Sequence, residues 1–105
     1  MKRRRMMKFV FNQMSIDGQV IDRCFANMMK IYKHNFITGN ISPGVKRIYD
    51  TRKSLFEIVM PDYERALEFI NEQIDLRGLE EDKRFANDYI DAMIYYCAVN
   101  LWNDV

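Results

Sequence analysis

The residues from Tyr89 to Trp102 constrain the fold of this chain more than any other stretch. They read YIDAMIYYCAVNLW, have helical spacing, and include four aromatic side chains in fourteen residues. A surface helix carries a single apolar stripe about 100° wide. Here two neighbouring stripes are apolar, one formed by Tyr89, Met93 and Tyr96 and one by Ile90, Ile94 and Cys97. We therefore expect a helix that is covered on more than one side, by its own domain and by a second copy or a partner.

Length and composition favour a single folded domain. The chain has 105 residues, of which 49% are apolar, and it contains few glycines and prolines, which argues against disorder. The longest apolar run, residues 92–99, is far shorter than the roughly 20 residues of a membrane-spanning helix. Cys24 and Cys97 have no paired spacing, which indicates two buried thiols in a reducing, cytoplasmic compartment. We expect no membrane association.

Opposite charges are concentrated in the two halves of the chain. Residues 1–53 contain 12 Lys and Arg against 3 Asp and Glu, whereas residues 54–105 contain 4 against 12. A basic half raises the local concentration of polyanions. Two interpretations remain open: the halves neutralise each other within one molecule or a dimer, or the basic surface faces outward to a charged partner.

The first half of the chain is expected to form a flexible basic tail, a strand and a helix. The tail is residues 1–7, and residues 8–105 make one domain. Residues 8–14 are aromatic and β-branched, which predicts a strand. Asp17 is placed to cap an amphipathic helix over about residues 19–36, and Gly39 lies where a left-handed residue would end it.

The second half is expected to begin with a β-hairpin. Its strands would be residues 45–50 and 55–60, joined through the polar residues 51–54. Pro61 fits the first position of a helix that stops at Arg77-Gly78, and residues 80–82 would open the last helix with three carboxylates. The prediction is an α+β fold: a small three-stranded sheet in the order β-α-β-β-α-α, covered by helices and completed by a long aromatic C-terminal helix.

No catalytic pattern emerges from the sequence. Phosphate-cradling glycine loops, zinc-ligand spacings and nucleophile motifs do not occur. His34 is the only histidine, at the end of a basic helix. Glu64, Glu68, Glu72 and Asp75 recur at helical steps, which is typical of a solvated acidic face rather than an acid–base pair. We predict that the chain is not an enzyme, and that it uses no catalytic residue, metal, cofactor or small-molecule substrate.

The leading functional hypothesis is a small protein-binding module of the inhibitor or adaptor type, which forms homo-oligomers and binds a host or cellular protein. Aromatic and Met side chains are enriched in interface cores. The predicted protein interface lies on the C-terminal helix and consists of Tyr89, Met93, Tyr95, Tyr96, Leu101 and Trp102.

The alternative hypothesis is a module that binds RNA or single-stranded nucleic acid. Basic side chains would contact phosphates and an exposed aromatic would stack on a base. The candidates are Arg3, Arg4, Arg5, Lys8, Lys46, Arg47, Tyr49, Arg52 and Lys53.

The small size and the composition rich in Met and aromatics, with Met1, Met6 and Met7 closely spaced, resemble small accessory proteins of large bacteriophages. Such proteins often bind and block a host factor. No residue role follows from this resemblance.

Overall fold

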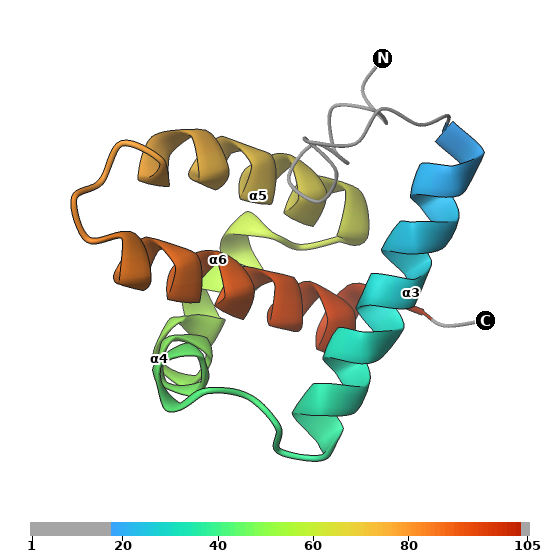
Figure 1. Cartoon of the computed structure of the whole chain (residues 1–105), viewed down its shortest axis with the longest axis horizontal. Helices are drawn as coiled ribbons and strands as arrows, with labels where there is room; N and C mark the ends of the chain where they lie inside the picture. The colour runs from blue at the N-terminus through green and yellow to red at the C-terminus, as the bar shows by residue number, and fades with distance from the viewer. Residues whose placement is uncertain (1–17, 104–105) are drawn as a thin grey trace.

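The computed structural model describes the backbone of residues 18–103 and the side chains of residues 26–103. Four α-helices and a terminal π-helical turn make up this part: α3 (Gly18–Ile37), α4 (Pro43–Val59), α5 (Tyr63–Arg77), α6 (Lys83–Tyr96) and η1 (Cys97–Leu101). Figure 1 shows their arrangement. The expected α+β fold is wrong, because residues 18–103 contain helices and no strand. The strand predicted over residues 8–14, the tail of residues 1–7 and the cap at Asp17 lie outside the described residues.

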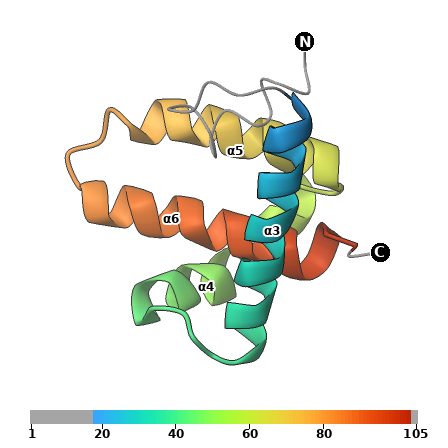
Figure 2. The same cartoon turned by 45° about the vertical axis from the view of Figure 1, so that its right-hand side comes forward.

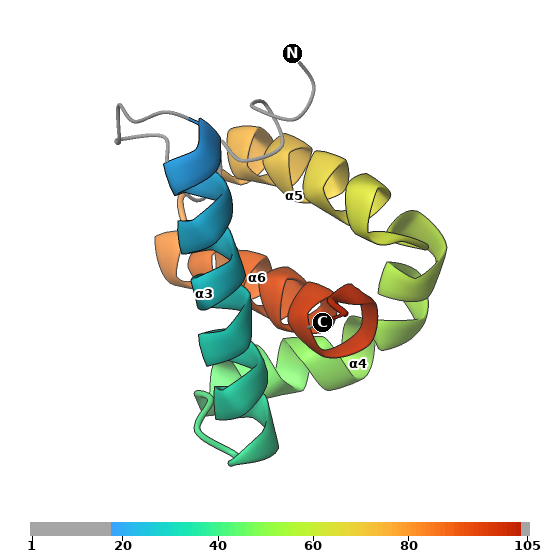
Figure 3. The ribbon, with the colours of Figure 1, turned by 90° about the vertical axis from the view of Figure 1, so that its right-hand side faces the viewer.

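Helix α6 is the central element of the fold. It packs against α3, α4 and α5, and its continuation η1 packs against α3 and α5. Helices α4 and α5 lie on opposite sides of α6, and α3 runs across them (Figure 1, Figure 2). Viewed from its C-terminal end, α6 is surrounded by the three other helices (Figure 3). This confirms that the last helix is covered by its own domain on more than one side.

The predicted β-hairpin is a single helix, α4. Ser42 is its N-cap, with an Oγ that accepts a hydrogen bond from the backbone N–H of Val45, and Pro43 occupies the first turn. The buried positions Val45, Ile48, Tyr49 and Phe56 recur at helical spacing on one face. Residues 51–54 contain no glycine and continue the helix. The Ser-Pro pair is a helix start signal, and the short apolar runs on either side of the supposed bend are parts of one helical stripe.

Other boundaries follow the sequence more closely. Helix α3 confirms the helix predicted over residues 19–36, and Gly39 has a φ of 76° in the left-handed region. Pro61 is not the first residue of α5, because Asp62 is the N-cap and accepts a hydrogen bond from the N–H of Arg65. Asp82 likewise caps α6 through the N–H of Phe85. Both caps satisfy backbone donors that a helix start leaves unpaired.

Aromatic side chains hold the core together. Phe56 of α4 meets the rings of Tyr89 and Tyr96 on α6, with centroids 5.9 and 5.7 Å apart. Helix α3 joins the same core through its own aromatic residues, since Tyr32 lies 4.7 Å from the ring of Tyr95. Edge-on and tilted contacts of this kind are favoured between aromatic rings. The largest fully buried side chains are Phe56, Met29, Met60, Ile70, Met93 and Cys97.

Candidate functional site

The side chains predicted to form a C-terminal protein interface lie largely inside their own chain. Tyr89, Met93, Tyr95 and Tyr96 are buried, and Leu101 and Trp102 are half-buried. Tyr95 is covered by the rings of α3, and the indole of Trp102 lies 5.7 Å from the ring of Tyr63 at the start of α5. Burial raises the pKa of the Tyr95 and Tyr96 hydroxyls. A single copy therefore supplies most of the cover that these residues need.

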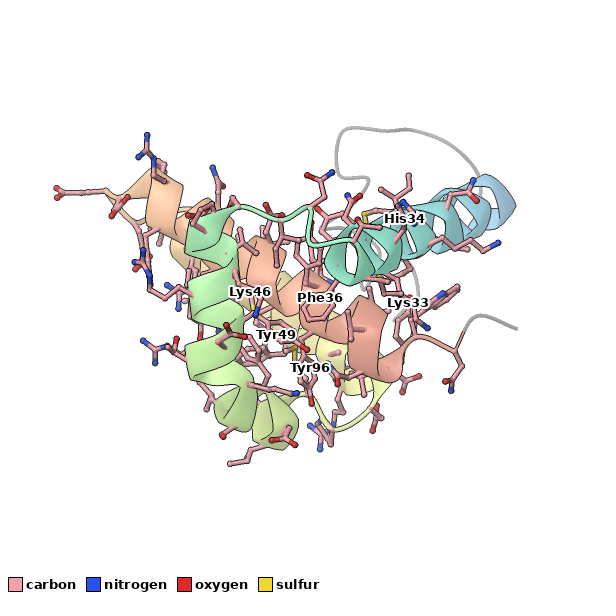
Figure 4. All side chains as sticks on the ribbon, turned by 90° about the horizontal axis from the view of Figure 1, so that it is seen from below. Lys33, His34, Phe36, Lys46, Tyr49 and Tyr96 are labelled. Atoms are coloured by element: carbon pink, nitrogen blue, oxygen red, sulfur yellow. The ribbon has the colours of Figure 1, made fainter. Side chains whose placement is uncertain are left out.

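Tyr49, the predicted base-stacking residue, also belongs to the core. Its side chain is only 3% exposed, and its ring lies 4.9 Å from Phe36 and 6.3 Å from Tyr96. Figure 4 shows these three side chains converging between α3, α4 and the end of α6. The amide Nδ2 of Asn100 donates a hydrogen bond of 3.0 Å to the Tyr49 hydroxyl. This enclosed ring has no free face for a nucleotide base.

Four of the basic residues predicted to bind nucleic acid lie on α4 and are exposed: Lys46, Arg47, Arg52 and Lys53. Lys46 is paired within the helix with Asp50, at 2.8 Å. The ammonium group of Lys53 lies 5.8 Å from the centroid of the Tyr49 ring, and the guanidinium carbon of Arg52 lies 6.0 Å from that of Tyr89. Arg3, Arg4, Arg5 and Lys8 lie outside the described residues.

The outward side of α4 presents a row of exposed residues at helical steps of four, three and four: Arg47, Thr51, Ser54 and Ile58. We call this row, with the neighbouring Leu55, the α4 outer face. Ile58, the last but one residue of α4, is a large apolar residue that is 75% exposed. The predicted hairpin did not indicate this face, because residues three or four positions apart share one face of a helix, whereas side chains alternate between the two faces of a strand.

A second group of residues surrounds Tyr89. The guanidinium carbon of Arg77, the last residue of α5, lies 3.7 Å above the Tyr89 ring and 5.7 Å from that of Phe85. Its Nη1 donates a hydrogen bond of 3.1 Å to Oε2 of Glu80. The sequence indicated Arg77 only as a helix end. The pair Phe85 and Tyr89, one helical turn apart, was the available signal for an aromatic stacking partner.

Within the described residues, helices α4 and α5 carry opposite net charges. Helix α4 carries four basic and two acidic residues, and α5 carries two basic and four acidic ones. The two helices lie on opposite sides of α6 (Figure 3). The ion pairs Lys46–Asp50 and Arg77–Glu80 are local and do not join α4 to α5. This arrangement favours a basic surface that faces outward over neutralisation between these two helices.

Two side chains of the described residues, His34 and Cys97, belong to types that often bind metals or act as nucleophiles. His34 is exposed at the end of α3, and within residues 26–103 no three metal-ligating side chains gather. The thiol of Cys97 is fully buried, and burial raises its pKa, which disfavours the nucleophilic thiolate. No helix in the described part of the chain combines the length and apolar character needed to cross a membrane.

Comparison of the sequence with protein-family models gave no match, and searches of curated proteins and of solved structures likewise gave none.

Proposed function

We propose that this chain is a small non-enzymatic binding protein that docks its α4 outer face on an acidic surface of a partner protein, as an inhibitor or adaptor does. The observation that carries the proposal is the 75% exposure of Ile58 in the same helical row as Arg47. An exposed aliphatic residue and an arginine on the same face of a helix combine the apolar contact and the charge-assisted hydrogen bond that interface centres use.

The neighbouring residues support the same choice. Leu55 adds a second partly exposed apolar side chain to the α4 outer face. Lys53 and Arg52 flank the helix on the side of the core tyrosines, so α4 remains basic overall. A partner surface with carboxylates around an apolar centre would complement this helix. A reducing cytoplasmic setting is part of the proposal and is consistent with the free, buried thiol of Cys97.

Self-association through the C-terminal helix is a weaker candidate. Its aromatic residues already contact Tyr32, Phe36 and Tyr63 of the same chain. A second copy using them would have to displace those contacts. The exposed α4 outer face requires no such rearrangement.

Nucleic-acid binding is supported by the exposed cations of α4 and opposed by the burial of Tyr49. Without an exposed ring, phosphate contacts alone would remain, and these carry strong salt dependence without base stacking.

The test is affinity capture from the native cell with nuclease-treated and untreated lysates. The chain is used in its unaltered form, as an Arg47→Glu/Ile58→Asp variant, and as an Ile37→Asp control. Ile37 ends α3 and is 73% exposed, so the control repeats the Ile58→Asp change, without the charge reversal at Arg47, on a similarly exposed apolar site elsewhere. A protein retained after nuclease, lost with the α4 variant and kept with the control supports the proposal. Loss of all partners after nuclease would indicate nucleic acid instead. Equal retention by both variants would overturn the role of the α4 outer face.

A further inference from the structure

We propose that Arg52 and Arg77 form a binding site for a small polyanion that carries two oxyanion groups, phosphate or carboxylate. The site lies where α4, the end of α5 and the first half of α6 meet around the ring of Tyr89. It is separate from the α4 outer face, because Arg52 points to the Tyr89 side of α4 and is not part of the row that contains Arg47 and Ile58.

The two arginines are brought together by one buried ring. The guanidinium carbon of Arg77 lies 3.7 Å from the Tyr89 centroid, and that of Arg52 lies 6.0 Å from the same point. Two cations placed at one ring in this way lie within about 10 Å of each other. The ring itself is buried and meets Phe56 edge-on, at an interplanar angle of 87°. The position of the ring is therefore set by the core.

Most hydrogen-bond donors of the two guanidinium groups are uncommitted. Arg77 uses Nη1 for one oxygen of Glu80, and its Nε is buried without a hydrogen-bond partner. Arg52 forms its cation–π contact and is exposed, with no carboxylate partner among residues 26–103. A guanidinium group has five N–H donors and binds oxyanions through pairs of them. Of these two cations, only Arg77 contacts a carboxylate of the described residues, that of Glu80, so positive charge is in excess at this site.

Arg77 is also prepared for binding. Its side chain is 18% exposed and lies against the rings of Tyr89 and Phe85, so little conformational freedom remains to be lost. Fixing an arginine side chain in advance strengthens its interaction with a planar or tetrahedral oxyanion. Glu80 already places a carboxylate oxygen 3.1 Å from this guanidinium group. A ligand would extend that chemistry to Arg52 and compete with Glu80 for Arg77.

The test is an NMR titration of the arginine side-chain N–H signals at low ionic strength, with inorganic pyrophosphate in one arm and citrate in the other. We expect saturable shifts of the Arg52 and Arg77 signals. Arg52→Gln should weaken binding about tenfold, because it removes a charged hydrogen-bond donor. Arg47→Gln is the matched control on the other side of α4 and should leave the affinity unchanged. Glu80→Gln should strengthen binding by removing the competing carboxylate.

Saturation in the pyrophosphate arm alone would assign a phosphate ligand, saturation in the citrate arm alone a carboxylate ligand, and saturation in both a general oxyanion site. Shifts that never saturate, or an equal loss with Arg52→Gln and Arg47→Gln, would overturn the site. Arg77 itself is left unchanged, because it packs on Tyr89 and its replacement would confuse folding with binding. The docking proposal for the α4 outer face would survive this result, since it depends on Arg47 and Ile58.

Discussion

The hydroxyl of Tyr32 on α3 donates a hydrogen bond of 3.1 Å to Oδ1 of Asp91 on α6, a residue 59 positions later in the chain. This bond links the described start of the domain to its central helix. Both groups are partly buried. Loss of water around Asp91 raises the pKa of its carboxyl, which the hydrogen bond from Tyr32 only partly offsets. Burial and the neighbouring carboxylate raise the pKa of the Tyr32 hydroxyl.

The raised pKa of Asp91 predicts a pH dependence of folding stability. The folded state holds the proton of Asp91 more tightly than the unfolded chain does. Proton binding by Asp91 therefore stabilises the folded state. This stabilisation is complete below the unfolded pKa of about 3.9 and is lost as pH rises through the folded pKa. Asp91→Asn keeps an oxygen acceptor and removes the charge. We expect this variant to be at least as stable as the original chain at pH 7, with an advantage that shrinks toward pH 3.5. Urea unfolding across this pH range measures it. A variant less stable at pH 7 would mean that the charged carboxylate is stabilising overall.

Tyr32→Phe tests the other partner of the same bond. It leaves the partly buried carboxylate of Asp91 without its donor, which we expect to lower the free energy of unfolding by about 1 kcal/mol at pH 7. In the Asp91→Asn background the loss should be smaller, because a neutral amide needs the donor less. An equal loss in both backgrounds would assign the effect to packing of the Tyr32 ring.

The helical start of α4 predicts a measurable cap. Ser42→Ala removes the Oγ that accepts a hydrogen bond from the N–H of Val45, at 3.3 Å. The free energy of unfolding should fall by about 1 kcal/mol. Ser42→Asp is the control, because it retains a capping oxygen and should preserve stability. If residues 45–60 formed a hairpin instead, neither change would follow this order.

Gly44 in the first turn of α4 predicts a coupling with Asp88 of α6. A Cβ at position 44 would lie 2.5 Å from Oδ2 of Asp88, so the aspartate side chain would have to move. In a helix, Ala normally exceeds Gly in stability by about 1 kcal/mol. We expect Gly44→Ala to gain less than this alone and to recover the full gain when Asp88→Ala is added. A double-mutant cycle by thermal unfolding measures the coupling, and additive effects would contradict the close approach.

Because aromatic rings of other helices cover α6, we expect Tyr95→Ala to lower folding stability rather than to change self-association. Tyr95 is 8% exposed and contacts Tyr32 and Phe36, so its truncation should lower the free energy of unfolding by about 3–5 kcal/mol, the range for large aromatic residues in cores. The molar mass in solution, measured by light scattering, should not change with this variant under native conditions. If the chain forms a dimer that dissociates on Tyr95→Ala without loss of stability, the result would support the hypothesis of an interface on the C-terminal helix.

The central position of α6 could be predicted from sequence because its residues are apolar on adjacent faces, a pattern that demands several covering elements whatever their type. The ends of α3 and α5 could also be predicted from the sequence, because Gly39 and Gly78 follow the helical stripes. The prediction of a hairpin over residues 45–60 was wrong for a definite reason. Two runs of β-branched and aromatic residues separated by polar ones satisfy a hairpin pattern and a helical stripe equally well, and only Ser42-Pro43 distinguished them.

The candidate sites were harder to predict from the sequence, because each depends on contacts between residues that are far apart in the chain. Tyr49 was expected to be exposed on a hairpin, and the helix instead turns it toward Phe36 and Tyr96. Arg77 and Tyr89 are twelve residues apart, and their stacking depends on the turn that reverses the chain between α5 and α6. Sequence composition contained no information on which side of α6 the basic helix α4 would lie.

Placing α4, which has two more basic than acidic residues, and α5, which has two more acidic than basic ones, on opposite sides of α6 separates opposite charges within a molecule whose net charge is only +1. Such a molecule is hardly attracted as a whole to a charged surface, yet it experiences a torque there. It would turn its α4 side toward an acidic partner before the two touch, and added salt would slow that encounter by weakening the torque.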